Sequence, residues 1–282
     1  MFTLQAQNPY GQILELTHNE AYVIKNIIGL DPPDGVINVT RNAGADGSVY
    51  NSSYVDNRTI TITLAINAPA EENRINLYTY FKSKSPVRLY YKNESRDVYI
   101  DGYVKNINIG FFDKKQVAQI VILCPKPFFN SADDALFDFT LIQPAFTFPF
   151  DIPAEGIEFS TLDAGGERLV YNAGDVETGF TISMAAKDIV INPQVYNVYT
   201  NEYFALNITM QAGDEITINT RKKEKSVTLL SNAITTNIVG NIKEGSTWLQ
   251  LTPGNNYLIV TASNYPENLL AYCTVTSQFE GV

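Results

Sequence analysis

Residues 58–66, RTITITLAI, form the clearest repeating pattern in the chain. Ile60, Ile62, Leu64 and Ile66 alternate with three threonines and an alanine. Successive side chains of a β-strand point to opposite faces, so a period of two predicts a strand with one buried face. The residues on either side of this segment predict the elements that neighbour the strand.

The segment after this strand, residues 67–86, predicts the single helix of the chain. Pro69 suits a first helical turn, the two glutamates that follow complement the helix dipole, and Pro86 stops the helix. Three apolar residues share one helical face: Leu77, Tyr78 and Phe81.

Further strands are expected in the first half of the chain. Gly102 lies inside one of them, which indicates a bulge or a close approach of another backbone. Segments rich in Gly, Pro, Asp and Asn read as loops at 31–35 and 41–48. The expected strands are PVRLYYK (86–92), RDVYIDGYVKNINIGFF (96–112) and KKQVAQIVILCPKPFF (114–129).

The second half of the chain predicts an antiparallel β-sandwich or jelly roll, because short strands follow one another without helical periodicity. The segment before this half contains aromatic residues and prolines but shows neither the period of two of a strand nor the period of a helix. This indicates an extended connector. We therefore expect a first domain at 1–132, a connector at 133–150 and a second domain at 151–282. The expected strands cover 179–185, 188–193, 194–200, 203–214, 215–220, 226–232, 248–251, 257–262 and 269–280.

Composition limits the class of protein. Hydrophobic residues make up 45% and charged residues 18%, an ordinary globular balance. No apolar run approaches the roughly 18 residues of a membrane span, and the N-terminus lacks the pattern of a secretory signal, so we expect no membrane anchoring. Cys124 and Cys273 fall in different predicted domains, so we expect no disulfide, and no Cys/His cluster is present to hold zinc. These features point to a reducing cytosol, or to a particle assembled there.

Charge is distributed unevenly along the chain. The net charge is −10, yet residues 1–130 hold 13 basic and 12 acidic side chains, for +1, whereas residues 131–282 hold 7 and 18, for −11. An acidic half repels phosphate backbones, and neither half has a basic stripe. We therefore expect no sequence-specific nucleic-acid partner.

Candidate catalytic residues are few. His18 is the only histidine, so a nucleophile–base pair would have to be built around it, and we expect an exposed loop residue instead. The segment 163–175, DAGGERLVYNAGD, lacks the GxxxxGK[ST] pattern of a phosphate loop. The acidic pairs Glu71–Glu72 and Asp133–Asp134 fit a helix start and a linker better than glycosidase carboxylates. The sequence therefore predicts no enzyme, with no catalytic, metal-binding or cofactor-binding residues.

Two other local patterns have structural interpretations. Arg221, Lys222, Lys223 and Lys225 lie between two expected strands and read as a charged hairpin tip, although an anionic partner could use it. The sequons at Asn38, Asn51 and Asn93 are attributed to β-turns rather than to glycosylation.

Trp248, the only tryptophan, is either a sugar-stacking platform or part of the core of a sandwich. It shares a strand face with Gln250, opposite Leu249 and Leu251, so alternation leaves its side ambiguous. A lone tryptophan near a hairpin in a sandwich is more often core, because aromatic residues bury large areas. We expect Trp248 to be a core plug.

Several segments resemble the distal tail proteins of tailed bacteriophages. Residues 68–82 and 88–129 are similar to the N-terminal belt domain of that family. Residues 197–232, residues 245–260 and the terminal FEGV (279–282) resemble its second domain.

The resemblance implies a structural role in the virion. It implies a hexameric ring at the tail tip or baseplate, assembled in the host cytoplasm, which joins the tail tube to a tip or baseplate hub protein. The ring-forming domain, 1–132, would have the β-sandwich-plus-helix fold of tail-tube subunits. The second domain, 151–282, would be a galectin-like sandwich at the periphery, where receptor-binding proteins attach.

Two alternatives to a structural hub stay open at this point. A carbohydrate-binding adhesion module would use the second domain, and exposed aromatic residues with Asn, Asp or Arg on one sheet face would favour it. A tail-associated hydrolase lacks a catalytic set.

Overall fold

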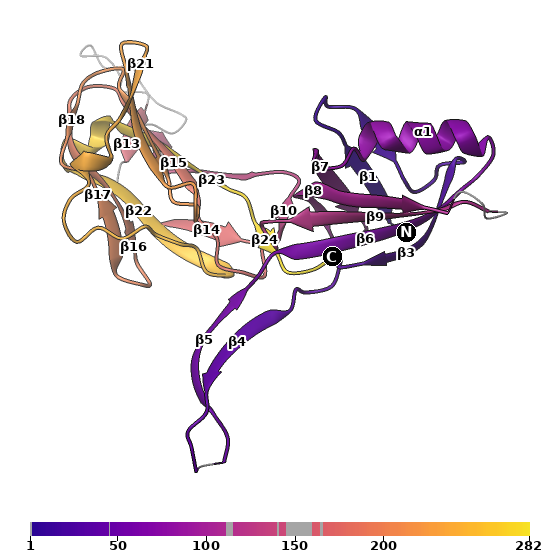
Figure 1. Ribbon diagram of the computed structural model, residues 1–282. Helices are drawn as coiled ribbons and strands as arrows, with labels where there is room; N and C mark the ends of the chain where they lie inside the picture. Colours follow the sequence, from indigo (N-terminus) through magenta and orange to yellow (C-terminus); the bar gives the residue numbers. More distant parts are fainter. Residues whose placement is uncertain (1, 45, 111–114, 140, 145–159, 164–165) are drawn as a thin grey trace. The chain divides into compact units, whose positions relative to one another are not determined.

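The computed structural model describes residues 2–44, 46–110, 115–139, 141–144, 160–163 and 166–282 (Figure 1). The chain is mainly β-structure with one α-helix, as expected, and it divides into two compact units. Unit 1 comprises Met1–Asp133 and Gln278–Val282, and unit 2 comprises Asp134–Ser277.

Unit 1 contains an antiparallel sheet in the order β2-β1-β7-β8-β9-β6-β3, to which β10 and β24 are added: β10 pairs with both β8 and β24. β4 and β5 form a separate two-stranded ribbon, and α1 (Ala70–Tyr80) connects β6 to β7. The strands are β1 (Thr3–Gln7), β2 (Ile13–Glu15), β3 (Tyr22–Ile28), β4 (Gly35–Thr40), β5 (Val49–Val55), β6 (Arg58–Ile66), β7 (Pro86–Lys92), β8 (Asp97–Ile109), β9 (Val117–Cys124), β10 (Phe129–Ser131) and β24 (Gln278–Phe279).

The predicted strand and helix at the centre of unit 1 are confirmed. β6 spans Arg58–Ile66 and buries its alternate residues in the core. Leu77 and Phe81 bring the helix onto the same core, while Tyr78 is half-buried and lies under the guanidinium of Arg74. Tyr22 of β3 fixes the helix from the sheet side, because its hydroxyl donates to the Asn73 carbonyl at 2.8 Å.

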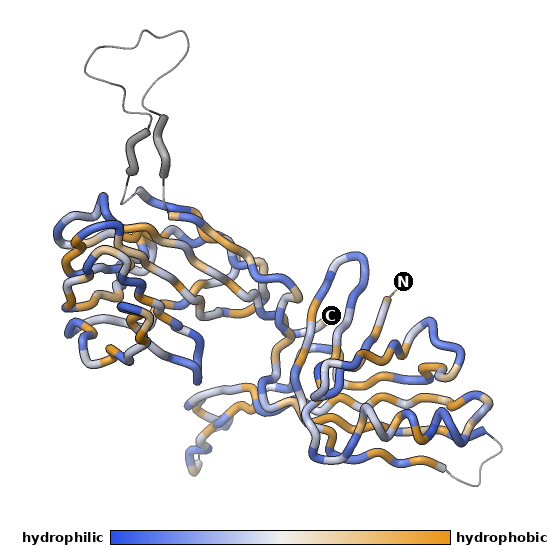
Figure 2. The backbone as a smooth tube through the Cα atoms, turned by 90° about the horizontal axis from the view of Figure 1, so that it is seen from above, coloured by the Kyte–Doolittle hydropathy of each residue, from blue (hydrophilic) through white to orange (hydrophobic). Residues whose placement is uncertain are grey.

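Unit 2 is a sandwich of two antiparallel sheets around one apolar core. Hydrophobic and hydrophilic residues alternate along its strands (Figure 2). The first sheet contains β11 (Ala135–Asp138), β23 (Leu269–Val275), β15 (Thr181–Ala186), β19 (Glu215–Asn219), β20 (Ser226–Ser231) and β21 (Ile234–Asn237), in that order. The second contains β14 (Arg168–Asn172), β22 (Gly254–Asn264), β16 (Val190–Asn197) and β17 (Glu202–Ala205), with β18 (Thr209–Met210) beside β16. β12 (Leu141–Pro144) pairs with β13 (Ser160–Asp163), and two short 3₁₀ helices cover Val239–Asn241 and Pro266–Asn268.

The units differ from the predicted domains at two points. Residues 278–282 belong to unit 1 rather than to the second domain, because β24 pairs with β10 and Phe279 is buried there. Part of the expected connector is a strand, because β11 pairs with β23. Residues 145–150 of that connector lie outside the described residues.

Several strand predictions in unit 2 are wrong in detail. The expected strands 188–193 and 194–200 form the single strand β16, in which Asn192 adopts a positive φ of 53° that asparagine tolerates within an extended segment. The expected strand 248–251 makes only an isolated bridge, between Leu251 and Thr178. The expected strand 269–280 divides into β23 and β24.

Gly102 marks a close approach, which is one of the two predicted alternatives: the nearest atoms belong to side chains, and the Leu123 backbone oxygen would lie 3.0 Å from a Cβ atom at this position. A Cβ atom at this position would lie 2.5 Å from Cγ2 of Ile122 and 2.8 Å from Sγ of Cys124, both on β9. The bulge of β8 falls elsewhere, between Val104 and Asn106.

We predict that Gly102→Val destabilises the protein by roughly 1–3 kcal/mol, because the added atoms overpack the core against β9. Urea unfolding measures the change in free energy. Gly35→Ala is the control, because a Cβ atom there meets nothing within 4 Å. Equal stability of the two variants would contradict the packing argument.

Candidate assembly surfaces

The ribbon of β4 and β5, here called the arm, leaves the sheet of unit 1 as an isolated hairpin (Figure 1). Among the described residues, neither strand pairs with any other strand. Its thirteen strand residues, 35–40 and 49–55, include no charged side chain. An isolated two-stranded hairpin is at best marginally stable in water, and open strand edges invite further pairing.

Apolar side chains are exposed on both faces of the arm. Ile37, Val39 and Tyr50 lie on one face and Val49 and Tyr54 on the other, all of them exposed. Large exposed apolar surface is typical of interaction sites in soluble proteins. The arm is therefore a candidate for a protein–protein interface. The arm was not predicted from the sequence, although β4 contains several β-branched residues and β5 contains two tyrosines.

Two of the predicted turn sequons lie in the strands of the arm. The amide nitrogen of Asn38 donates to the Ser52 hydroxyl at 3.0 Å, and that of Asn51 donates to the Thr40 hydroxyl at 2.6 Å. Both side chains therefore link the two strands. Asn93 does shape a turn, since its side-chain oxygen accepts from the backbone N–H groups of Ser95 and Arg96.

Arg58, the first residue of β6, is a buried cation that fastens several segments of unit 1. Its Nε donates to the Pro127 carbonyl at 2.6 Å, and Nη1 donates to the carbonyls of Gly29 and Asp31, each at 2.7 Å. Nη2 donates to the carbonyl of Glu280 in the C-terminal segment. Burial lowers the pKa of Arg58, while nearby negative charges oppose that shift.

Aromatic contacts complete this C-terminal clasp, which we define as Arg58 with residues 278–282. Phe279 pairs with Phe129 across β24 and β10, and the guanidinium of Arg96 lies 4.0 Å from the centre of the Phe279 ring. The Arg58 guanidinium lies 4.7 Å from the Phe129 ring centre. Val282 donates its backbone N–H to the Leu30 carbonyl at 3.3 Å. Unit 2 is thus inserted between two chain segments that pair with each other in unit 1.

Trp248 is neither an exposed platform nor a fully buried plug. The centre of its half-buried ring lies 4.9 Å from the centre of the buried Phe204 ring. Nζ of Lys225 lies 5.3 Å from the centre of the Trp248 ring. Leu249 and Leu251, on the opposite side of the chain, are the buried residues. The expectation of a core plug is therefore only partly met, because no regular strand carries Trp248 into the sandwich.

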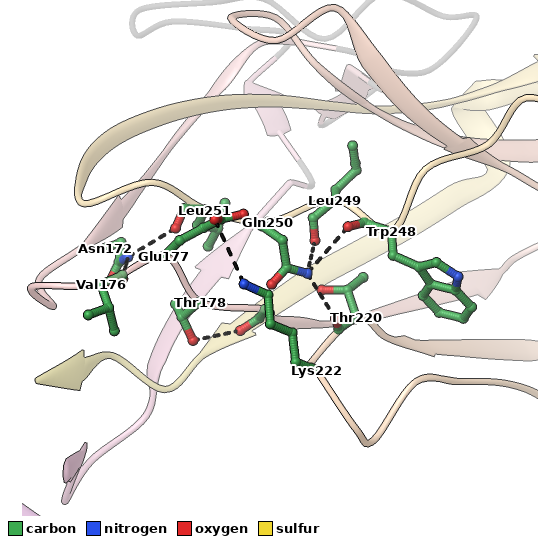
Figure 3. Close-up of polar contacts among 11 residues, drawn as sticks. Asn172, Val176, Glu177, Thr178, Thr220, Lys222, Trp248, Leu249, Gln250 and Leu251 are labelled. Atoms are coloured by element: carbon green, nitrogen blue, oxygen red, sulfur yellow. Dashed lines mark hydrogen bonds and ion pairs between the residues drawn. The ribbon is translucent and has the colours of Figure 1, made fainter. Parts of the chain in front are cut away.

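Gln250 fixes the path of this segment. Its Nε2 donates to the Thr220 carbonyl at 2.9 Å and to the Leu249 carbonyl at 2.8 Å, and in Figure 3 the indole of Trp248 points away from this group.

The predicted hairpin tip at 221–225 is confirmed by the pairing of β19 with β20. Three of its four basic side chains have partners in unit 2. Arg221 donates to the Thr276 hydroxyl at 2.6 Å, Lys222 lies 3.8 Å from a Glu177 carboxylate oxygen, and Lys225 covers Trp248.

The other residues considered for catalysis are dispersed. His18 is exposed in a turn, as expected. Glu71 pairs with Arg74 in the helix, and Asp134 accepts a hydrogen bond from Thr276 in unit 2. Residues 164 and 165 of the glycine-containing segment lie outside the described residues; Asp163 ends β13, residues 168–172 form β14, and a bend follows at 174–175. The structure does not bring the described members of this set together.

A furrow of about 400 Å³ lies in unit 1 beside the ends of β1, β7 and β8. Its charged groups satisfy each other, because Arg88 binds Asp101 through two hydrogen bonds of 2.7 and 2.9 Å. These hydrogen bonds raise the pKa of Arg88. The furrow therefore offers little unpaired charge to a ligand.

The cysteines are buried and unpaired, one in each unit. Burial raises the pKa of the Cys124 thiol to about 12 and also raises that of Cys273. Neither is suited to act as a thiolate at neutral pH. Among the described residues, no group of three His, Cys, Asp or Glu side chains could hold a metal ion, and no helix is long and apolar enough to cross a membrane.

Two family models of known proteins match the chain, one in each unit. A family model for the C-terminal domain of the siphovirus-type tail component matches residues 173–274, and one for the phage tail protein RIFT-related domain matches residues 11–124. No curated protein sequence matches the chain.

Two solved structures share the fold. The SPP1 Dit protein, described as a paradigm of the hub adsorption apparatus in phages that infect Gram-positive bacteria, is 15% identical with a TM-score of 0.69, over 99% of both chains. A chain of the phage P2 baseplate, in its activated conformation with Ca, is 10% identical with a TM-score of 0.51, over the whole of both chains.

We predict that Arg58→Met lowers the free energy of unfolding by about 2 kcal/mol, because it removes the buried guanidinium that donates to four partly buried backbone carbonyls. The C-terminal segment should also become sensitive to carboxypeptidase. Arg88→Met is the control, since its partly exposed ion pair contributes at most about 1 kcal/mol. An unchanged protease sensitivity would show that Arg58 does not hold the C-terminal segment.

We predict that Trp248→Ala costs less than the roughly 3–5 kcal/mol of a fully buried aromatic residue, because its ring is only half-buried. Leu249→Ala, in the core, should cost about 2–5 kcal/mol. Thermal or urea unfolding compares them, and acrylamide should quench the single tryptophan partially. Complete protection from acrylamide would contradict the half-buried position.

Proposed function

This chain belongs to the distal tail proteins of siphovirus-type bacteriophages, and on that premise we propose that it forms a hexameric ring at the tail tip. In this proposal the ring joins the tail tube to a baseplate or tip hub protein. Its place in the virion is the tail tip, and the chain acts there as a structural subunit. Closed cyclic symmetry lets identical subunits satisfy all their interfaces without open ends.

The exposed, uncharged arm is the observation that carries the ring proposal. A two-stranded hairpin with apolar residues on both faces needs a partner to become rigid. A second copy of the chain supplies such a partner at the same position of every subunit. The near-neutral residues 1–130 keep electrostatic repulsion low where copies meet, because their net charge is +1.

Unit 2 is assigned to the periphery of the ring. Most of the charge of −11 on residues 131–282 belongs to this unit, and six such units repel one another less outside a ring than inside it. This position would leave unit 2 accessible to receptor-binding proteins. Because the chain passes between the units twice, both connections would share any force applied to unit 2.

A non-enzymatic role fits the described side chains. The candidates for catalysis are scattered, and the charged residues of the furrow are paired with each other. The matched families are structural tail components. The alternative of a carbohydrate-binding module gains nothing from Trp248, whose ring is occupied by Phe204 and Lys225.

We predict that Ile37→Lys combined with Tyr50→Lys prevents ring formation, because six copies would bury unpaired ammonium groups at the arm. Light scattering on the full chain measures the mass of the assembly, and circular dichroism checks that the fold is kept.

The control places the same two charges on unit 2. Ile234→Lys with Leu136→Lys is a fair match, because Ile37 and Ile234 are each 64% exposed and Leu136 is 68% exposed. This variant should keep the hexameric mass. A hexamer that survives the arm substitutions would refute the assignment of the arm as ring interface.

A further inference from the structure

The outer face of the sheet β14-β22-β16-β17 in unit 2 is an aromatic surface. Alternate strand residues, among them Val170, Phe204 and Leu258, point into the core, so the residues between them point outward. We define the tyrosine face as these outward residues and the adjoining Tyr199: Leu169, Tyr171, Tyr196, Tyr199, Tyr203, Tyr257 and Ile259.

Strand register makes this face continuous. Leu169 pairs with Tyr257, and Tyr196 pairs with both Ile259 and Tyr203. Directly opposed residues lie about 5 Å apart at Cβ, which places neighbouring side chains in contact. The Tyr199 ring meets the Tyr257 ring edge to face, with centres 5.2 Å apart and planes at 88°. This pair forms a corner of two perpendicular ring faces.

Intramolecular contacts hold the central rings in place. The Tyr196 hydroxyl donates to the Asn201 side-chain oxygen at 2.6 Å, and the Tyr203 hydroxyl donates to the Glu244 carbonyl at 3.2 Å. Rings that are already fixed lose little conformational entropy when a ligand binds. Tyr171 and Tyr199 remain 51% and 64% exposed, so they are accessible to such a ligand.

Several other outward positions on this face are polar but uncharged. They carry the amides of Gln194 and Asn255 and the hydroxyl of Thr261. Lys243 lies at the margin, with Nζ 5.9 Å from the Tyr203 ring centre. A polyanion would meet an acidic unit with few cations to balance its charge, so the face favours a neutral ligand.

We propose that the tyrosine face binds an uncharged oligosaccharide. A sugar ring presents aliphatic C–H groups on its faces, which the negative face of an aromatic ring attracts, and hydroxyls at its rim, which amides and hydroxyls can bind. Tyrosine is also enriched in the hot spots of protein interfaces, so a protein partner is the competing occupant that the nitration experiment below separates from an oligosaccharide. The proposal is independent of the ring.

The test is calorimetric titration of the full chain with maltohexaose, cellohexaose, chitohexaose and β-1,4-galactotetraose, with polygalacturonate as the anionic comparison. We expect saturable binding of at least one neutral oligosaccharide and none of the polyanion. Tyr171→Ala and Tyr199→Ala should each weaken that binding at least tenfold, while the assembled mass stays unchanged. Tyr272→Ala, a tyrosine 44% exposed on the other sheet, should leave the affinity unchanged.

Three results would overturn the proposal. The first is that none of the four neutral oligosaccharides binds, and the second is that binding persists in both face variants. The third uses nitration by tetranitromethane: if assembly of the chain, rather than added oligosaccharide, protects Tyr171 and Tyr199, the face is a protein interface. Failure here leaves the ring proposal standing, because that proposal depends on the arm and on assembled mass.

Discussion

The Arg58 guanidinium is the interaction on which unit 1 depends. It donates to backbone carbonyls from three separate segments: the turn after β3, the link from β9 to β10, and the C-terminal tail. Burying a cation is costly, as its lowered pKa shows, and the carbonyl acceptors offset that cost only when all segments are in place. One side chain therefore couples the fold of unit 1 to the last residues of the chain.

Unit 2 is attached to unit 1 at both of its ends. The chain leaves unit 1 after β10 and returns through β24, and these two strands pair with each other. Within unit 2 the first and last strands, β11 and β23, also pair. Each end of the insertion is therefore held by a ladder of hydrogen bonds.

The surfaces of the two units suit different partners. The arm in unit 1 has open strand edges and apolar side chains, which other strands and apolar surfaces can cover. The tyrosine face in unit 2 instead presents fixed rings among uncharged amides and hydroxyls. The surfaces proposed for assembly and for recognition are thus separate, so substitutions can test one proposal without disturbing the other.

The sequence by itself determined the features that depend on near neighbours: the strand at 58–66, the helix before Phe81 and the hairpin tip at 221–225. Each follows from local periodicity or local turn chemistry. Only the tertiary structure decided that the terminal residues pair with β10, that the arm stands alone, that Trp248 is half-buried and that five tyrosines share one face. Alternation along a strand shows that one face differs from the other, but the strand's neighbours are set by pairings between distant segments. For that reason VYNSSYV has the same pattern whether it lies in a sheet or in a free arm.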